Sequence, residues 1–223
     1  MGAKRTAVLI SGGGSNLQAL LDAPGNAAEI ALVVSNRPNT FGLERARRHG
    51  VPAALVDHRS FAGREAFEAE LDARLRAAAI ELVCLAGFMR VLTPGFVEAW
   101  RDRLLNIHPS LLPAFPGLDT HARALAAGCQ VHGCTVHLVR PTLDDGPILV
   151  QGVVPVLPDD DATRLAARVL EVEHRCYPIG LDLLARGPVT IDGNRVMVPG
   201  GAPRLLMHER CNVDVPPASG ICP

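Results

Sequence analysis

The sequence predicts an α/β fold: a mostly parallel, twisted sheet flanked by helices, with antiparallel strands in the C-terminal half. Three observations lead to this prediction. Short apolar runs alternate with helix-like segments in the first half. A run of glycines separates the first apolar run from the first such segment. Two longer apolar runs later in the chain are separated only by an acidic turn.

The elements of the first half follow from apolar runs and helical spacing. We expect strands at Thr6–Ile10, Glu29–Ser35, Ala53–Asp57, Glu81–Ala86 and Leu104–His108. We expect helices between them at Ser15–Asp22, Gly42–His49, Arg64–Ala79 and Pro94–Trp100. Within the third helix Phe67, Leu71 and Leu75 recur at every fourth residue, so they form one apolar face. This alternating order is typical of a helix-covered parallel sheet.

The second half changes character. Val131–Arg140 and Ile148–Val156 are predicted to form an antiparallel pair. A long helix is expected at about Asp161–Ala185, because acidic residues suit a helix N-terminus. Pro188–Val198 has the pattern of a small hairpin around an Asp-Gly turn. We expect residues 1–198 to form a single domain, and residues 199–223, which are rich in Pro and Gly, to form a flexible tail.

Composition and charge exclude several classes of function. The chain has 223 residues, 22 basic and 23 acidic, with a formal net charge of −1. It therefore lacks the basic surplus of a general nucleic-acid or anionic-membrane binder. No apolar run approaches the roughly 20 residues that span a bilayer, and the N-terminus does not resemble a secretory signal. We expect a cytoplasmic protein with reduced cysteines and no metal, because none of the six cysteines forms a C-x-x-C pair.

The glycine run predicts a phosphate site. In VLISGGGSNLQALL the glycines at 12–14 lie between a strand and a helix that begins with Ser15 and Asn16. Glycine lets the backbone approach a ligand closely, and free N–H groups at a helix start attract anions. The stretch is neither a phosphate-binding Walker loop nor the dinucleotide-binding glycine pattern, which would need glycine where Leu17 stands. A tight turn without a ligand is the alternative.

A second candidate site lies in LLNIHPSLLP. Alternate residues of a strand share a face, so Asn106 and His108 point the same way, opposite to Leu105 and Ile107. Pro109 ends the strand and leaves His108 at the carboxyl edge, where α/β sheets bind ligands. An amide and an imidazole can stabilise an oxyanion, and histidine can transfer a proton near neutral pH. The pattern therefore favours polarisation of a carbonyl, with a structural histidine as the alternative.

A carboxylate would be needed to orient such a histidine or to stabilise its charged form. The turn between the two antiparallel strands supplies Asp144 and Asp145. The residue types alone do not decide which of them meets His108. Both could also be ordinary turn residues.

Taken together, these segments resemble the phosphoribosylglycinamide formyltransferase family. The matching stretches, in the family's order from about Thr6 to Asp192, are GGGSNLQALL, VSNRPN, FMRVLTP, LLNIHPSLLPAFPGLDTH, HGCTVHLV, LDDGPILVQ and EHRCYP. The resemblance implies a Rossmann-like fold. It also implies transfer of a formyl group from 10-formyltetrahydrofolate to the amine of 5-phosphoribosyl-glycinamide in purine biosynthesis. The implied partners are small molecules, with no metal, nucleic acid or membrane, and the implied assembly is a monomer or homodimer.

The resemblance also assigns roles to residues. Asn106 and His108 would stabilise the oxyanion, and Asp144 would support a protonated His108. Asp145 stands where the family often has glycine, which makes it the weaker candidate. For substrate binding the pattern implies a phosphate loop and an acidic residue on the long helix: Gly14, Ser15, Asn16 and Glu173. For the folate it implies two segments and an arginine: Arg64; Met89, Arg90, Val91 and Leu92; and Asn106 with Arg140, Pro141, Thr142, Leu143 and Asp144. Pro141 departs from the usual loop and should stiffen it.

The sequence leaves three alternative functions to consider. Methionyl-tRNA formyltransferase shares the Asn-x-His-Pro signature. Those enzymes usually have a further C-terminal domain, for which we expect the 31 residues after Asp192 to be too few, and tRNA binding would need a basic surplus that a net charge of −1 does not supply. Formyltetrahydrofolate hydrolase usually carries an extra N-terminal domain, whereas the first strand here begins at Thr6. A silent phosphate- or folate-binding module would not need Asn106, His108 and Asp144 together.

Overall fold

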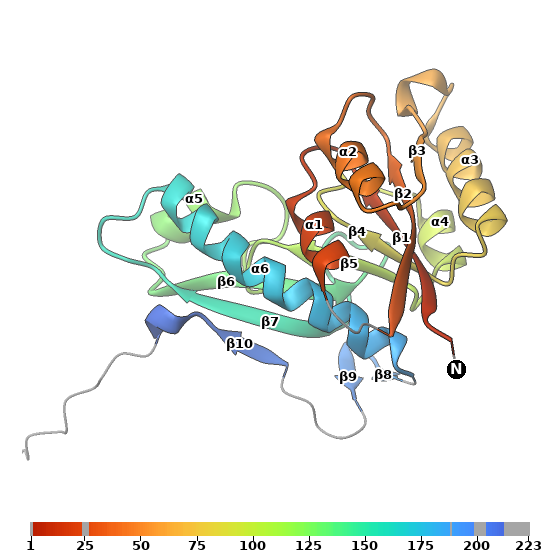
Figure 1. Cartoon of the computed structure of the whole chain (residues 1–223). Helices are drawn as coiled ribbons and strands as arrows, with labels where there is room; N and C mark the ends of the chain where they lie inside the picture. Colours follow the sequence, from red (N-terminus) through yellow and green to blue (C-terminus); the bar gives the residue numbers. More distant parts are fainter. Residues whose placement is uncertain (1, 24–26, 188, 199–203, 212–223) are drawn as a thin grey trace, which may run out of the picture.

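A computed structural model describes residues 2–23, 27–187, 189–198 and 204–211. Eight strands form one sheet in the order β10-β7-β6-β5-β4-β1-β2-β3 (Figure 1). Their bounds are β1 Lys4–Ile10, β2 Ala28–Ser35, β3 Ala53–Leu55, β4 Leu82–Leu85, β5 Leu104–His108, β6 Val131–Leu138, β7 Ile148–Pro155 and β10 Leu205–Met207. Strands β3, β2, β1, β4 and β5 pair in parallel, and β6 pairs antiparallel with both β5 and β7. The predicted α/β fold is confirmed.

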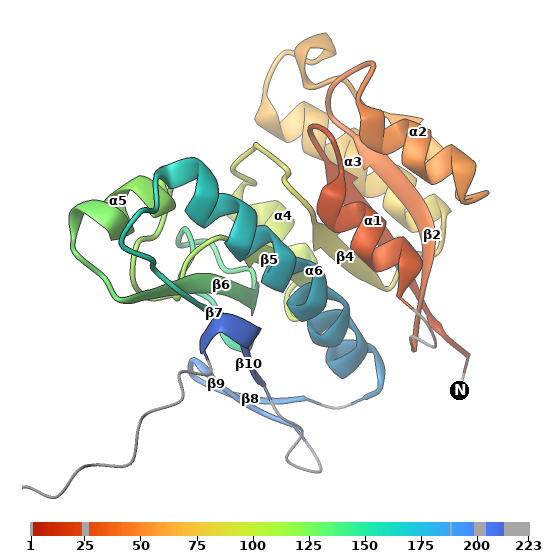
Figure 2. The same cartoon turned by 60° about the vertical axis from the view of Figure 1, so that its left-hand side comes forward.

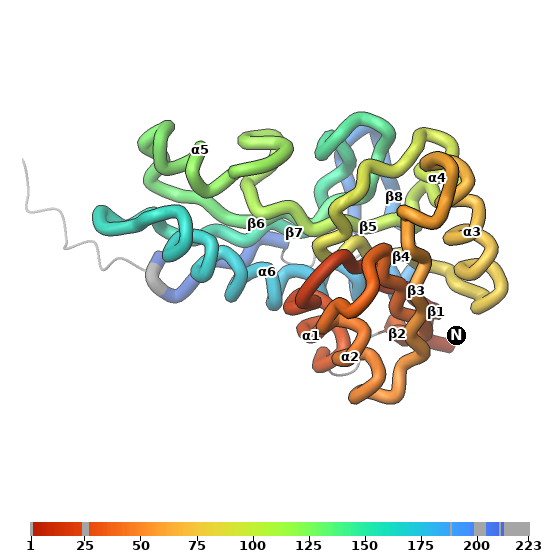
Figure 3. The backbone as a smooth tube through the Cα atoms, turned by 90° about the horizontal axis from the view of Figure 1, so that it is seen from above, coloured from red at the N-terminus to blue at the C-terminus, as the bar shows by residue number. Residues whose placement is uncertain are grey.

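Helices cover both faces of this sheet. Their bounds are α1 Ser15–Asp22, α2 Phe41–Arg48, α3 Arg64–Ala77, α4 Pro94–Ala99, α5 Thr120–Ala126 and α6 Ala162–Ala185. Seen from above, α1, α2 and α6 lie on one side of the sheet and α3 and α4 on the other (Figure 3). Among the described residues, no helix is long and apolar enough to span a membrane.

The side chains of β1 show how the sequence builds two cores. Val8 and Ile10 belong to the cluster under α1 and α6, whereas Ala7 and Leu9 belong to the cluster under α3. All four are fully buried. Because successive strand residues point to opposite faces, a central strand covered on both sides must be apolar throughout. The continuous run at the start of the chain is such a strand.

Most predicted elements form at or close to the expected bounds, and β5 matches without change. The hairpin around Asp192-Gly193 is confirmed by β8 Thr190–Asp192 and β9 Arg195–Met197, which pair antiparallel. The third strand is shorter than predicted, because Asp57 caps a short 3₁₀ helix at His58–Ser60 and accepts a hydrogen bond from the Arg59 amide. Helix α5 was not predicted, and it follows the loop after β5.

The expected flexible tail differs from the structure over one segment. Leu205–Met207 forms β10, which pairs in parallel with β7 at the edge of the sheet, and a 3₁₀ turn follows at Glu209–Cys211 (Figure 2). Leu206 packs against the core while its two neighbours are exposed. Backbone pairing with an open edge and one apolar anchor are enough to order a short strand. The rest of the predicted tail, 199–203 and 212–223, lies outside the described residues.

Candidate active site

Strand β5 places Asn106 and His108 at the centre of the sheet. Leu85 of β4 is the parallel partner of Asn106, and β6 runs antiparallel along the other side. Leu105 and Ile107 face the core under α6. Asn106 and His108 therefore share the opposite face, as the alternation predicts. His108 is buried and Asn106 is partly exposed.

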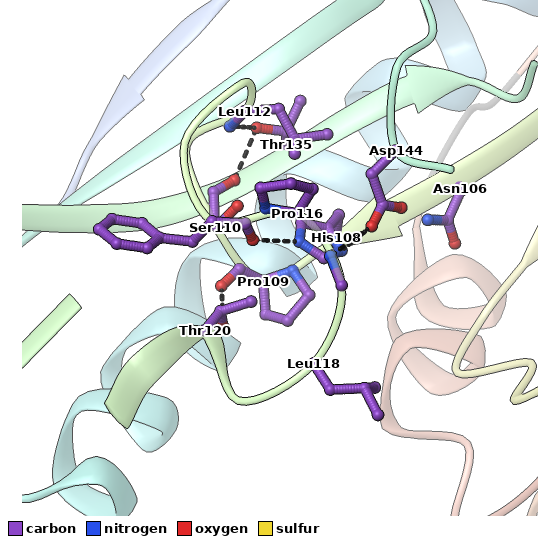
Figure 4. Close-up of polar contacts among 12 residues, drawn as sticks. Asn106, His108, Pro109, Ser110, Leu112, Pro116, Leu118, Thr120, Thr135 and Asp144 are labelled. Atoms are coloured by element: carbon purple, nitrogen blue, oxygen red, sulfur yellow. Dashed lines mark hydrogen bonds and ion pairs between the residues drawn. The ribbon is translucent and has the colours of Figure 1, made fainter. Parts of the chain in front are cut away.

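His108 lies between two hydrogen-bond acceptors (Figure 4). Its Nε2 is 3.0 Å from the carbonyl oxygen of Phe115, and its Nδ1 is 3.5 Å from Oδ2 of Asp144. A neutral imidazole can donate from one nitrogen only, whereas an imidazolium donates from both. Each ring nitrogen of His108 faces an acceptor, one from the loop after β5 and one from Asp144. The structure thus selects Asp144 over Asp145 as the carboxylate that meets His108.

Asp144 is held in place by its backbone and by a neighbouring loop. Its φ of 53° lies in the left-handed region, which turns the carboxylate back toward the sheet. Oδ2 accepts a hydrogen bond of 2.8 Å from the Gly117 amide. The side chain is only 7% exposed, so the carboxylate acts on His108 with little screening by water.

The loop between β5 and α5 supplies the acceptor at Phe115 and the donor at Gly117. The Thr120 hydroxyl donates to the carbonyl of Pro109 (Figure 4). The Ser110 hydroxyl donates to the carbonyl of Ala114. These short-range bonds fold the loop back over the strand end. Pro109 begins this loop, so its position after His108 serves the arrangement of the whole site.

Sequence reasoning missed His137, which lies opposite Asn106 on β6. Its Nδ1 lies 3.1 Å from the Leu138 carbonyl, which assigns a proton to Nδ1 and leaves Nε2 as an acceptor. Nε2 is 3.2 Å from Nδ2 of Asn106, so the amide donates to it. Burial lowers the pKa of His137 to about 4, which keeps the ring neutral at neutral pH. The alternating polar residues of β6 were the available signal.

The contact with His137 fixes how Asn106 can act. A side-chain amide carries two N–H donors. One donates to His137, and the Asn106 side chain remains partly exposed. The second N–H is therefore available to an oxygen that lies beside His108. The arrangement can stabilise a negative charge that develops on that oxygen.

The glycine loop forms the second part of the site. A cavity of about 360 Å³ lies over residues 11–16 and extends to Met89. Gly14 has a φ of 72°, and a Cβ there would lie 2.9 Å from Cα of Gly42 at the start of α2. Only glycine meets both conditions without strain. The first amides of α1 have no intrahelical acceptor and border this cavity, which suits a phosphate.

Asn16 and Glu173 meet although they are 157 residues apart in the sequence. Nδ2 of Asn16 donates to Oε2 of Glu173 over 2.7 Å. Burial raises the pKa of Glu173, and the Asn16 hydrogen bond opposes that shift. Oδ1 of Asn16 is also buried, and it has no hydrogen-bond partner among the described residues. Because buried polar atoms rarely stay unpaired, this oxygen points to a donor group on a ligand.

The segments expected to bind folate border these groups. The amide of Met89 donates to the Ser11 hydroxyl at the end of β1, which ties the segment 89–92 to the glycine loop. Met89 and Val91 are 64% and 57% exposed, which is unusual for large apolar side chains. Leu92 is buried, and the Arg90 guanidinium lies over the Phe67 ring of α3.

The other residues predicted to bind folate are mostly exposed, and Arg140 is held by an ion pair. Arg64 is exposed at the first residue of α3, one turn before Phe67. Pro141, Thr142 and Leu143 are exposed in the loop that leads to Asp144. Arg140 begins that loop and forms an ion pair of 2.5 Å with Asp102, in the turn that precedes β5. Within the described part of the chain, His, Cys, Asp and Glu side chains form no cluster of three or more that could hold a metal.

Comparison with known proteins identifies the family of this chain. The sequence profile described as formyl transferase matches residues 4–181. The chain is 51% identical over 193 residues to the trifunctional purine biosynthetic protein adenosine-3 of Drosophila melanogaster, covering 84% of this chain and 14% of that protein. It is 44% identical over 196 residues to phosphoribosylglycinamide formyltransferase of Escherichia coli, covering 86% of this chain and 92% of that protein.

Solved structures agree with the sequence relatives. Glycinamide ribonucleotide transformylase 1 of Symbiobacterium toebii superposes with a TM-score of 0.86 at 48% identity, over 88% of this chain and 94% of that chain. Phosphoribosylglycinamide formyltransferase of Anaplasma phagocytophilum has a TM-score of 0.86 at 41% identity, covering 93% and 100%. The chain belongs to the formyl transferase family.

Proposed function

We propose that this chain transfers the formyl group of 10-formyltetrahydrofolate to the amine of 5-phosphoribosyl-glycinamide, a step of purine biosynthesis. The observation that carries the proposal is the meeting of Asn106, His108 and Asp144 at one strand end, beside a glycine loop suited to a phosphate. The reaction needs a donor that polarises the formyl carbonyl, a group that carries a proton and a site for the substrate phosphate. Asn106, the His108–Asp144 pair and the glycine loop would supply these three functions.

The chemistry begins when the substrate amine attacks the formyl carbon. The carbonyl oxygen becomes an oxyanion, which the free N–H of Asn106 and the charged ring of His108 would stabilise. Asp144, 3.5 Å from the ring, would stabilise the imidazolium. As the bond between the formyl carbon and N10 of the folate breaks, a proton must leave the attacking nitrogen and another must reach N10. His108 would move these protons, directly or through water.

The remaining groups would bind the two substrates. Gly14, Ser15 and Asn16 would hold the phosphate through backbone amides, and Glu173 would contact the ribotide next to Asn16. The exposed apolar side chains of Met89, Val91 and Leu143 would cover the flat pterin ring, with Arg64 and the segment 140–144 at the rim of its site. The expectation of small-molecule partners in a monomer or homodimer belongs to the same proposal.

The test is a comparison of formyl acceptors. The purified protein is supplied with 10-formyltetrahydrofolate and, in separate reactions, with 5-phosphoribosyl-glycinamide, methionyl-tRNA or no acceptor, and folate release is followed by absorbance. Turnover that requires the ribotide supports the proposal. Turnover with methionyl-tRNA alone would indicate the tRNA enzyme, and equal release without an acceptor would indicate the hydrolase. Either result contradicts the proposal.

A further inference from the structure

We infer that Arg45 binds the phosphate of the sugar-phosphate substrate and sets the preference for a phosphorylated acceptor. The inference rests on the proposed function and assigns a binding role to a residue that sequence reasoning did not single out. Arg45 lies on α2, some thirty residues after the glycine loop. It nevertheless lines the same cavity as that loop. Among the described residues lining this cavity, Arg45 is the one with a charged side chain.

Three contacts hold the guanidinium at this position. Nε donates to the carbonyl of Gly13 over 2.9 Å, and an Nη donates to Oε1 of Gln18 over 2.8 Å. The guanidinium carbon lies 4.7 Å above the ring centroid of Phe41, which also borders the cavity. A guanidinium carries five N–H donors in a planar fork, and these two bonds use two of them. The remaining donors are available to a ligand.

Arg45 forms no direct ion pair with a carboxylate of the described residues; Asp22, whose pKa is lowered mainly by its hydrogen bond with Gln18 and to a smaller extent by Arg45, lies farther away. Over the described ranges of the chain, no Asp or Glu oxygen lies within 4.0 Å of its guanidinium, whereas Arg47 and Arg48 of the same helix both pair with Glu44. The backbone amides at the start of α1 supply only partial charges to a phosphate dianion. Arg45 would add a full positive charge with a geometry that matches phosphate oxygens.

The packing of α2 against the loop explains why this residue can reach the site. The Gly42 amide donates to the Gly12 carbonyl over 3.2 Å, and Gly14 and Gly42 are in backbone contact. The start of α2 is thereby fixed against the loop, and Arg45 follows Gly42 by three residues, on the adjacent turn. Its contact with Gly13 suggests a competing explanation, in which Arg45 only shapes the loop and touches no substrate.

The test uses two acceptors that differ only in the phosphate. Steady-state KM values are measured for the ribotide and for the corresponding nucleoside without phosphate, at saturating 10-formyltetrahydrofolate. We expect Arg45→Gln to raise the ribotide KM by roughly 10- to 100-fold, the usual range for one charged hydrogen bond. The nucleoside KM and the folate KM should stay within about twofold, and kcat should change little, as for lost uniform binding. Arg45→Lys should recover part of the ribotide affinity, and Arg47→Gln, the control on the same helix, should match the wild type.

Two outcomes overturn the inference. An unchanged ribotide KM in Arg45→Gln excludes a phosphate contact, and an equal loss for ribotide and nucleoside indicates a loop-shaping role only. Titration calorimetry of ribotide and nucleoside, without the folate, separates this inference from the proposed function. If the wild type binds the ribotide more tightly than the nucleoside and Arg45→Gln removes that difference, then Arg45 binds the phosphate. This conclusion holds even if no formyl transfer is detected. If the wild type transfers formyl but the variant keeps the difference, the function stands and the role of Arg45 does not.

Discussion

His137 should make the stability of this protein depend on pH, and the effect can be isolated with one substitution. The ring is 2% exposed, and burial lowers its pKa from 6.5 to about 4. In the unfolded chain it takes up a proton as the pH falls through about 6.5, whereas the folded chain keeps it neutral until about pH 4. The unfolded state therefore binds more protons in this window, and acidification favours unfolding.

The magnitude follows from the two pKa values. Between about pH 7 and pH 5 the unfolded chain gains about 0.7 of a proton at this ring and the folded chain gains about 0.1. This difference removes about 2 kcal/mol from the free energy of unfolding. Acidification would also turn Nε2 of His137 into a donor that faces the Asn106 amide, itself a donor at 3.2 Å. Oδ1 of Asp144, 4.0 Å from Nε2, opposes the shift, but burial of the ring is the larger effect and lowers the pKa. The geometry and the direction of the pKa shift thus agree.

The assay is urea unfolding of the wild type and His137→Asn at about pH 7, 6 and 5. His137→Asn should lose about 2 kcal/mol less than the wild type over this range, whatever its stability at neutral pH. Val136→Ala is the matched control, because it truncates a buried side chain on the same strand and removes no titrating group. Equal pH dependence of the wild type and His137→Asn would refute the argument, since the ring would then titrate alike in both states.

Three further predictions concern the site. Asp144→Asn keeps the shape of the side chain and removes the charge beside His108, so kcat for formyl transfer should fall by roughly 10²- to 10⁴-fold in steady-state assays; a near wild-type kcat contradicts the proposed role. Asn16→Ala removes the buried donor to Glu173 and the unpaired oxygen, so the ribotide KM should rise while the folate KM does not; equal changes in both would argue against a substrate contact. Gly14→Ala forces an alanine into the left-handed region against Gly42, so differential scanning calorimetry should show a melting temperature lower by roughly 2–8 °C, and an unchanged value would mean that the loop relaxes freely.

The strands of the central sheet were predictable because each one has a recognisable pattern of apolar residues and strand-ending residues within its own short segment. Residues 7–10 are all apolar, and residues 104–108 are apolar except at the two polar positions of the site. Glycine follows the first run within two residues, and proline follows the second directly. The same alternation correctly separated Asn106 and His108 from Leu105 and Ile107. Strand β10 escaped prediction because three residues carry too little periodic signal, and because its order depends on an edge that β7 offers only in the folded protein.

Some parts of the candidate site were also predictable from the sequence, and others were not. A strand-end histidine, an amide two residues before it and a glycine turn before a helix are visible in the sequence, because each is set by neighbours within a few residues. Which carboxylate meets His108, and that Phe115 lies on the other side of its ring, depend on loops that fold back from later in the chain. His137 and Arg45 reach the site across strand pairing and helix packing, over separations of about thirty residues.

The sequence by itself determined the strand and helix order, the two faces of β5 and the chemical types of groups at its end, because side-chain periodicity and turn chemistry act locally. Only the tertiary structure decided the partners of those groups. It chose Asp144 over Asp145, placed the neutral ring of His137 against Asn106, joined Asn16 to Glu173 and brought the Arg45 guanidinium to the glycine loop. Such pairs are fixed by the sheet register and by close packing between segments far apart in the chain, and no local pattern records that geometry.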